Sequence, residues 1–383
     1  MCHLVIMHSM QTLSHPLTIL FVYLARPRMS RADMEQDITE LWHLVETLGN
    51  AQVMDLIHQK GEEFDATYIG PGKAEEVGVY LKTHPTDIII FNGQLKPSQK
   101  FTLMKLFWTI RPNIQIWDRV DLILAIFSSH ARTTEAKLQI ELARMYSMGP
   151  RIYGMGMVLS RQGGGIGTRG LGETNTELMK RHWKREIKRA KDELAKSAAA
   201  RLRQMEHRKN LGLQTISIVG YTNAGKTSLF NILTHKKHLV ERALFATLDS
   251  SVGEIFMPSL GKKVLISDTI GFIANLPPAL IEAFKSTLME SVHADIVLHI
   301  IDASDPLMTE KIGVVNDILD QLKIPREKKV LVFNKIDAAP ALDKQKISGL
   351  AGDIPHVFIS AKTKEGIETL TSTLLPHLIQ GNR

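Results

Sequence analysis

The segment "GYTNAGKTSLFN", from Gly220 to Asn231, contains a motif that is specific to one class of fold. It matches the pattern G-x-x-x-x-G-K-[ST], follows the apolar run "TISIV" and opens a helix pattern. The glycines let the backbone bend tightly, so that its N–H groups face phosphate oxygens. The pattern therefore predicts a phosphate-binding loop formed by Gly220, Tyr221, Thr222, Asn223, Ala224, Gly225, Lys226, Thr227 and Ser228.

Two segments are expected to bind the phosphates and Mg²⁺. Within the first, the phosphate loop, Lys226 provides charge for the outer phosphates and the Thr227 hydroxyl is a ligand for Mg²⁺. The segment "DTIG" follows the strand pattern "KKVLIS". Its Asp268 carboxylate can hold Mg²⁺ through water, and Gly271 can offer a backbone N–H to the terminal phosphate. We expect nucleotide contacts from Asp268, Thr269, Ile270 and Gly271.

The base is read by two later segments, "NKID" after "KVLVF" and "SAK" after "HVFI". The Asp337 carboxylate can accept hydrogen bonds from N1–H and the exocyclic amine of guanine, and adenine offers neither at that edge. Asn334 can brace the phosphate loop, and the alkyl stem of Lys335 can cover the face of the ring. Base contacts are expected from Asn334, Lys335, Ile336, Asp337, Ser360, Ala361 and Lys362. Four motifs in this order predict a guanine-nucleotide switch that binds GTP and GDP and hydrolyses GTP.

Three residues bear on how hydrolysis is switched on. Thr247, in "LFATLDS", is the candidate switch threonine that closes on Mg²⁺ and the terminal phosphate. Asn223 has two interpretations: it tolerates an unusual backbone angle, or it helps to bind a monovalent cation such as K⁺. Phe272 follows Gly271, where Ras-like switches carry the glutamine that orients the attacking water. The expected catalytic residues are Lys226, Thr247 and Gly271, and the expected Mg²⁺ ligands are Thr227, Thr247 and Asp268.

Strand and helix patterns alternate on both sides of a different middle region, which predicts an α/β fold. We expect an N-terminal α/β domain with a parallel sheet at residues 17–130, whose apolar strands include "LTILFVYL", "AQVMDLI" and "TDIIIF". Residues 213–383 are expected to form a C-terminal Ras-like GTPase domain. Residues 1–16 are expected to be an extension.

The middle region, 131–209, is predicted to be a helical hairpin, because apolar residues recur at helical spacing in both of its arms. Nine glycines between Gly149 and Gly172 predict a mobile loop at its tip. From Lys180 to Lys209 twelve Lys or Arg residues face four Asp or Glu residues, and the net charge of the whole chain is +7. This basic stretch suits nucleic acid, although a solvated helix face explains it equally well.

The cysteine content and the length of the apolar stretches indicate in which cellular compartment the protein acts. Cys2 is the only cysteine, so a disulfide framework is excluded and a reducing cytoplasm is expected. The clean apolar stretch from Leu17 to Ala25 is shorter than the ~20 residues of a spanning helix. We therefore expect a buried strand there, membrane contact that is at most peripheral, and a monomer.

With these residues in hand, the chain resembles the HflX-type GTPases over roughly residues 17–380. The resemblance rests on "ATYIGPGKAEEV", "WDRVDLILAIFSSHARTTEAKLQIELA" and "GGGIGTRGLGET" besides the guanine motifs. The chain departs from the family pattern at Leu171, where a proline is common, and after Thr174, where "NTELMKRH" replaces a more acidic stretch. We also expect it to lack the small extra C-terminal domain of some members.

The resemblance implies GTP hydrolysis stimulated by the large ribosomal subunit, and the splitting of stalled or hibernating ribosomes under stress. It also implies that the hairpin and the glycine-rich loop contact ribosomal RNA. A different function stays open from the residues: an RNA-binding or remodelling protein whose N-terminal domain also uses nucleotide, with the GTPase domain as regulator. "GPGK" (Gly70 to Lys73) would then bind phosphate, but it is shorter than a phosphate loop and we favour a turn that starts a helix.

Overall fold

The computed structural model describes residues 16–131, 133–147, 171–236, 251–269, 271–273, 280, 284–340 and 343–380. Contacts group the chain into two compact units, Met1–Ser129 with Ala143–Lys188 and His130–Leu142 with Arg189–Arg383. The hairpin segment is divided between these units, and the domain boundaries expected from the sequence stay a prediction. Residues 1–15, most of the glycine-rich loop, Thr247 and Ile270 lie outside the described residues.

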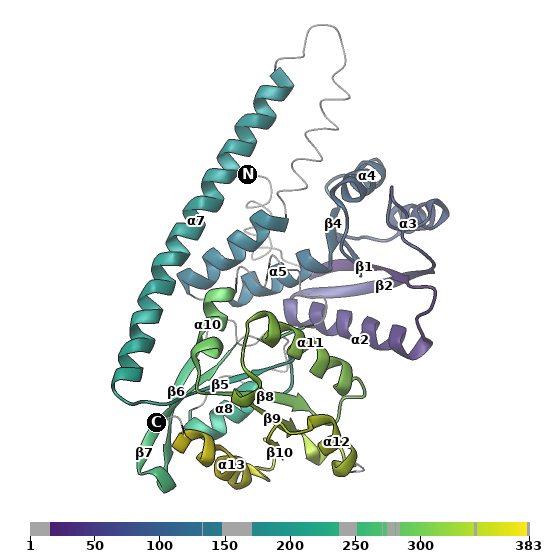
Figure 1. Cartoon of the computed structure of the whole chain (residues 1–383). Helices are drawn as coiled ribbons and strands as arrows, with labels where there is room; N and C mark the ends of the chain where they lie inside the picture. Colours follow the sequence, from purple (N-terminus) through teal and green to yellow (C-terminus); the bar gives the residue numbers. More distant parts are fainter. Residues whose placement is uncertain are drawn as a thin grey trace. The chain divides into compact units, whose positions relative to one another are not determined.

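The first unit is built on a parallel four-stranded sheet of order β2-β1-β3-β4 (Figure 1). Its strands are β1 (Leu17–Ala25), β2 (Ala51–Lys60), β3 (Ile88–Phe91) and β4 (Gln115–Asp118). Its helices are α2 (Arg31–Leu48), α3 (Pro71–Thr83), α4 (Pro97–Trp108) and α5 (Arg119–His130). The predicted alternation is confirmed here, including the buried strand at Leu17, which pairs with β2 on one side and β3 on the other.

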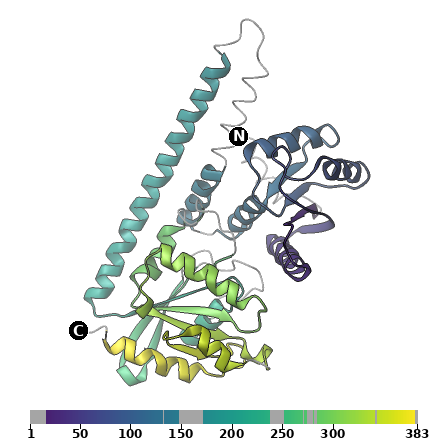
Figure 2. The ribbon, with the colours of Figure 1, turned by 45° about the vertical axis from the view of Figure 1, so that its right-hand side comes forward.

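Helices cover both faces of this sheet (Figure 2). Apolar residues of α3 and α4 pack against alternate residues of β1 and β3 in one core. On the other face α2 lies against the sheet, where Trp42 meets the ring of Phe21 edge-on with centroids 5.8 Å apart. The start of α2 is fixed by a capping box: the Ser30 hydroxyl accepts from the Asp33 N–H at 3.1 Å, and the Asp33 carboxylate accepts from the Ser30 N–H at 3.3 Å.

The segment "GPGK" forms the start of α3. Gly70 is the N-cap residue and Pro71 occupies the first turn, which proline favours because its φ is already helical. The Lys73 ammonium forms an ion pair with Glu76 one turn later, 2.6 Å away. This geometry matches the turn-and-helix interpretation of the segment.

The second unit contains a six-stranded sheet of order β10-β9-β8-β5-β7-β6. Its strands are β5 (Thr215–Gly220), β6 (Ser251–Met257), β7 (Lys262–Asp268), β8 (Ile296–Asp302), β9 (Lys329–Asn334) and β10 (His356–Phe358). Its helices are α8 (Lys226–Thr234), α10 (Lys285–His293), α11 (Met308–Gln321), α12 (Lys344–Ala351) and α13 (Ile367–Gln380). All pairs are parallel except β6–β7, and β6 is not predicted by the sequence patterns.

Two cores hold this sheet between helices. Side chains of α8 and α13 pack with the strands in the larger core, which includes Leu229, Phe230 and Leu374. Side chains of α12 and the start of α11 pack on the other face with Leu331 and Phe333. Because all strands except β6 run parallel, their carboxyl ends open into loops at one edge, and the sequence motifs follow these ends.

The predicted hairpin consists of a helix at residues 134–147 and the long helix α7 (Leu171–Asn210). Within the first unit, Trp183 Nε1 donates a hydrogen bond to the Met145 carbonyl at 3.2 Å. Within the second, Arg201 forms an ion pair with Glu135 at 2.8 Å. A residue late in one helix thus pairs with a residue early in the other, as in the antiparallel arrangement that the periodicity predicts.

Candidate active site

The predicted phosphate loop follows β5, which lies between β7 and β8. The strand order reverses at this point, and ligands of open α/β sheets bind at such reversals. Gly220 must be glycine, because a Cβ there would lie 2.3 Å from the Ile300 carbonyl oxygen. Asn223 and Gly225 have φ angles of 62° and 94°, so the loop turns sharply before α8 begins at Lys226. The loop therefore presents the N-terminus of a helix, where backbone N–H groups attract phosphate.

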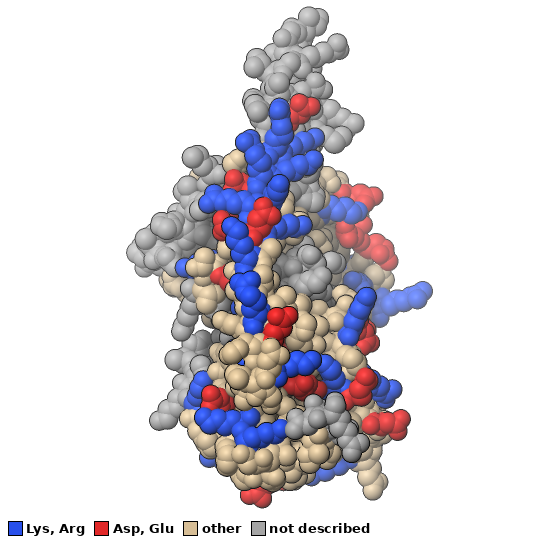
Figure 3. Space-filling view, turned by 60° about the vertical axis from the view of Figure 1, so that its left-hand side comes forward, with Lys and Arg blue, Asp and Glu red and all other residues tan. Residues whose placement is uncertain are grey.

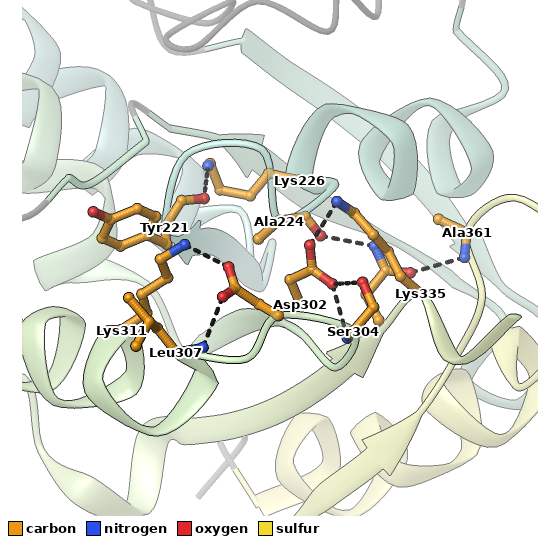
Figure 4. A network of polar contacts seen from close by, with 11 residues as sticks. Tyr221, Ala224, Lys226, Asp302, Ser304, Leu307, Lys311, Lys335 and Ala361 are labelled. Carbon is orange, nitrogen blue, oxygen red and sulfur yellow. Dashed lines mark hydrogen bonds and ion pairs between the residues drawn. The ribbon is translucent and has the colours of Figure 1, made fainter. Parts of the chain in front are cut away.

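Lys226 is held inside this loop. Its side chain is buried, and Nζ donates a hydrogen bond to the Tyr221 carbonyl at 2.8 Å (Figure 4). Burial lowers the pKa of Lys226 to about 8, an effect that the Asp268 carboxylate opposes and the Lys335 ammonium reinforces. The ammonium is therefore poised at the loop, where negative phosphate oxygens would favour its charged form.

The structure brings the expected Mg²⁺ ligands of the described residues together. Thr227 Oγ1 donates a hydrogen bond to Asp268 Oδ2 at 2.8 Å, and Asp268 is buried. Gly271 lies against Lys226, because a Cβ on Gly271 would lie 2.9 Å from Nζ. The set offers a hydroxyl and a carboxylate oxygen, which are hard donors that fit Mg²⁺. The Thr269 hydroxyl points away from this set and bonds to the Ile218 carbonyl at 2.7 Å.

Phe272 locks the "DTIG" segment to the phosphate loop through its backbone. Its N–H donates to the Gly220 carbonyl at 3.0 Å, and its carbonyl accepts from the Thr222 N–H at 2.7 Å. The side chain is only 2% exposed and packs inside the protein. A buried ring at this position cannot orient water, as the glutamine of Ras-like switches does.

Asn334 joins three loops. Its side-chain amide donates to the Ala224 carbonyl of the phosphate loop at 2.8 Å, and its Oδ1 accepts from the Ala361 N–H at 2.9 Å (Figure 4). The residue is 1% exposed, so these bonds are shielded from water and neither partner is easily replaced. The bracing role predicted for Asn334 matches this geometry.

The residues that the sequence predicts to read guanine are also adjacent. Ser360 Oγ donates to Asp337 Oδ1 at 2.7 Å, and Lys362 Nζ lies 3.9 Å from the same carboxylate. Lys335 has a φ of 65°, a backbone angle that only a few per cent of non-glycine residues adopt. Ile336 packs its side chain against the core beside β9 rather than toward the site.

The sequence patterns do not single out Asp302, the last residue of β8, or Ser304 just after it. The Asp302 carboxylate binds Lys335 Nζ at 2.7 Å, and its other oxygen accepts from the Ser304 N–H at 3.0 Å and hydroxyl at 2.6 Å (Figure 4). Asp302 stands at the carboxyl end of a buried strand, as the motif residues do. In the sequence, the position of Asp302 directly after an apolar strand pattern could have identified it as a candidate site residue.

Comparison with known proteins assigns the chain to a family. Residues 35–128, 130–208 and 215–335 match family models described as GTP-binding GTPase N-terminal, GTP-binding GTPase Middle Region and 50S ribosome-binding GTPase. The GTPase HflX of Caldanaerobacter subterraneus subsp. tengcongensis is 40% identical over 347 residues, which are 90% of this chain and 78% of that protein. The chain belongs to the HflX family of GTPases. Like other HflX proteins, it binds and hydrolyses GTP.

Further HflX relatives and a solved structure agree. The GTPase HflX of Escherichia coli K12 is 35% identical over 346 residues, covering 90% of this chain and 80% of that protein. A crystal structure of SsGBP in complex with GDP superposes with a TM-score of 0.51 at 24% identity, covering 95% of this chain and 99% of that one, and shows a similar fold. Among the residues that the structure describes, no helix of this HflX-family chain is long and apolar enough to span a membrane.

Proposed function

We propose that this HflX-family GTPase binds the large ribosomal subunit and uses GTP to split or rescue stalled or hibernating ribosomes. The observation that carries the proposal is the exposed basic surface of α7. The match of residues 215–335 to a family described as 50S ribosome-binding GTPase supports it. The cytoplasm is part of the proposal because its ribosomes are the target, and the protein would act there as a monomer.

The basic surface of α7 is defined by its exposed cations: Arg181, Lys184, Arg185, Lys188, Arg189, Lys191, Lys196, Arg203 and Lys209. Figure 3 shows Lys and Arg side chains gathered along this helix with few acidic ones between them. The apolar side chains Ala190 and Leu194 are buried, so one stripe of the helix packs and the rest faces solvent. A row of exposed cations on a helix suits the phosphates of RNA, which bind with release of counterions.

In the nucleotide site, the phosphate loop with Lys226 would bind the phosphates and Asp337 would select guanine. Thr227 and Asp268 would hold Mg²⁺, which spreads positive charge over the phosphate oxygens when bound. Thr247 would join them when the switch closes, and Gly271 would give its N–H to the terminal phosphate. K⁺ beside Asn223 is a second cation that this proposal includes.

Hydrolysis would be slow in the isolated protein. The residue after Gly271 is the buried Phe272, so no side chain at that position orients the attacking water. The large subunit would order the switch around Thr247 and complete the site. GTP would then be consumed mainly on the ribosome.

Sedimentation tests the proposal directly. Wild-type protein should pellet with isolated large subunits in the presence of a non-hydrolysable GTP analogue and less so with GDP. Added GTP should convert assembled ribosomes into subunits on a sucrose gradient. Lys226→Ala should abolish hydrolysis and nucleotide-dependent pelleting. Equal pelleting with both nucleotides, or with small subunits alone, would contradict the proposal and favour general RNA binding.

A further inference from the structure

An ion pair links the carboxyl end of β8 to the base-reading segment. Asp302 Oδ2 lies 2.7 Å from Lys335 Nζ, although the two residues are 33 positions apart. Both side chains are partly buried, at 18% and 30% exposure. Such a pair is less screened by water than a pair on the open surface, so it can fix where the lysine lies.

The position of Asp302 is itself fixed. Its second oxygen, Oδ1, accepts two hydrogen bonds from Ser304, one from the N–H at 3.0 Å and one from the hydroxyl at 2.6 Å. The carboxylate cannot rotate without losing both bonds. Oδ2 is therefore held toward Lys335, as Figure 4 shows.

Lys335 is the one residue of "NKID" whose side chain needs such a partner. Asn334 is held by Ala224 and Ala361, and Asp337 is held by Ser360. The Lys335 stem has four rotatable bonds, and ordering it for each nucleotide would cost side-chain entropy. Pairing its ammonium with Asp302 orders the stem beforehand.

We propose that Asp302 is a positioning residue for guanine binding: it holds the Lys335 ammonium so that the alkyl stem of Lys335 lies along the face of the base. The inference rests on the proposed assignment of "NKID" to guanine. It adds a residue outside the recognised motifs and predicts that Asp302 acts on the base through Lys335 alone.

The same loop supplies a matched control. Asp305 is 16% exposed in its side chain, similar to Asp302, and is also fixed by a backbone bond, from Leu307 N–H at 2.9 Å. Its ion pair is with Lys311, whose ammonium lies 4.8 Å from the centre of the Tyr221 ring. Asp305 is thus linked to the phosphate loop through Lys311, whereas Lys335 pairs with Asp302. Asp305→Asn removes an equivalent charge from the same loop.

The experiment measures the binding of fluorescent mant-GDP to the full chain, with inorganic tripolyphosphate as a competitor that has phosphates and no base. Asp302→Asn should weaken mant-GDP binding about fivefold to tenfold, as expected for a side chain that must be ordered anew. Tripolyphosphate should compete equally well in the variant and wild type. Asp305→Asn should not show this base-dependent loss.

A double-mutant cycle tests whether Asp302 acts on guanine binding through Lys335. Lys335→Met keeps the alkyl stem and removes the ammonium, so Asp302→Asn should have no further effect in that background. The same loss in both backgrounds, or equal weakening of tripolyphosphate, would overturn the positioning role. The variant Asp337→Asn distinguishes a failure of the guanine assignment from a failure of the role proposed for Asp302. If it leaves mant-GDP binding intact, the guanine assignment fails and the role of Asp302 fails with it. If Asp337→Asn weakens binding and Asp302→Asn does not, only the role of Asp302 fails.

Discussion

Thr227 donates its hydroxyl hydrogen to Asp268 at 2.8 Å, although the two residues are 41 positions apart in the sequence. Thr227 lies in the first turn of α8 and Asp268 ends β7, so the sheet brings together two oxygen donors from separate motifs. In a protein that hydrolyses GTP, this pair is where a divalent cation would join the phosphates.

Thr227→Ala should therefore raise the Mg²⁺ concentration needed for half-maximal hydrolysis by about tenfold or more. The measurement is a Mg²⁺ titration of steady-state GTPase activity. Thr234→Val at the other end of α8 is the control, because the Thr234 hydroxyl donates to the Phe230 carbonyl at 2.7 Å and accepts from the Lys236 N–H at 3.4 Å, both close by in the sequence. An unchanged titration in Thr227→Ala would place the cation elsewhere.

Nucleotide binding should depend on pH through Lys226. The pKa of this lysine is about 8 in the nucleotide-free protein, so the ammonium loses its proton as the pH rises through 8. Phosphate binds the charged form, hence GTP affinity should fall above pH 8 and binding should take up protons. Calorimetry in buffers of different ionisation enthalpy measures this uptake, and Lys226→Ala should remove it.

The lowered pKa of Lys226 also makes the free energy of unfolding depend on pH. The unfolded chain keeps the ordinary lysine pKa of 10.5, so between pH 8 and 10.5 it binds more protons at this residue than the folded chain. The contribution of Lys226 to the free energy of unfolding therefore rises with pH in that window. Nucleotide-free Lys226→Ala should lose this rise without a large fall in melting temperature at pH 7. A large fall would show that Lys226 is a structural residue.

Asp337→Asn should exchange guanine for xanthine specificity. The Ser360 hydroxyl fixes the carboxylate at 2.7 Å, so the introduced amide should occupy the same place and donate where the carboxylate accepts. GTP affinity should fall about a hundredfold while binding of xanthosine triphosphate improves. Competition assays with GTP, ATP and xanthosine triphosphate measure this. Wild-type protein that bound ATP as tightly as GTP would contradict the assignment.

Charge reversal on α7 should weaken ribosome binding and its dependence on salt. Arg185, Arg189 and Lys196 replaced by Glu should lower the slope of log affinity against log salt by about 2 to 3, as three lost phosphate contacts predict. The control reverses Lys82, Lys346 and Lys364, which are exposed but lie outside α7. Equal effects of the two triple variants would mean that the basic surface of α7 is a solvated helix face with no specific role in ribosome binding.

Cation dependence should distinguish the two interpretations of Asn223. Its φ of 62° is tolerated by glycine, so Asn223→Gly keeps the backbone and removes only the side chain. We expect weak stimulation of hydrolysis by K⁺ over Na⁺ in the wild type, its loss in Asn223→Gly, and strong stimulation by large subunits in both. Retained K⁺ stimulation in the variant would restrict Asn223 to its backbone role.

Phe272→Gln should not create a fast enzyme. The Phe272 side chain is buried while its backbone is bonded to Gly220 and Thr222, so a glutamine would enter the core rather than the solvent side where water attacks. Single-turnover hydrolysis without ribosomes measures the effect. A large gain in rate would mean that the loop can turn its side chain toward the nucleotide.

The sequence by itself determined the local patterns: the phosphate loop, the guanine motifs, and the strands and helices of two α/β regions. These follow from short-range rules, because glycine spacing, apolar runs and turn residues act within a few positions. It missed β6, whose alternate residues Glu254 and Phe256 are exposed, because an edge strand paired only with β7 has no continuous apolar run. Such a strand exists only through its antiparallel partner.

Tertiary structure alone decided which side chains meet. Asn334 reaches Ala224 across 110 positions, and Asp302 reaches Lys335 across the edge of the sheet. The lowered pKa of Lys226 arises from burial that no local pattern encodes. Parallel strands bring distant carboxyl ends to one edge, and the bonds between their loops then depend on strand order and packing. A single sequence specifies the residues at that edge, and the packed sheet selects their partners.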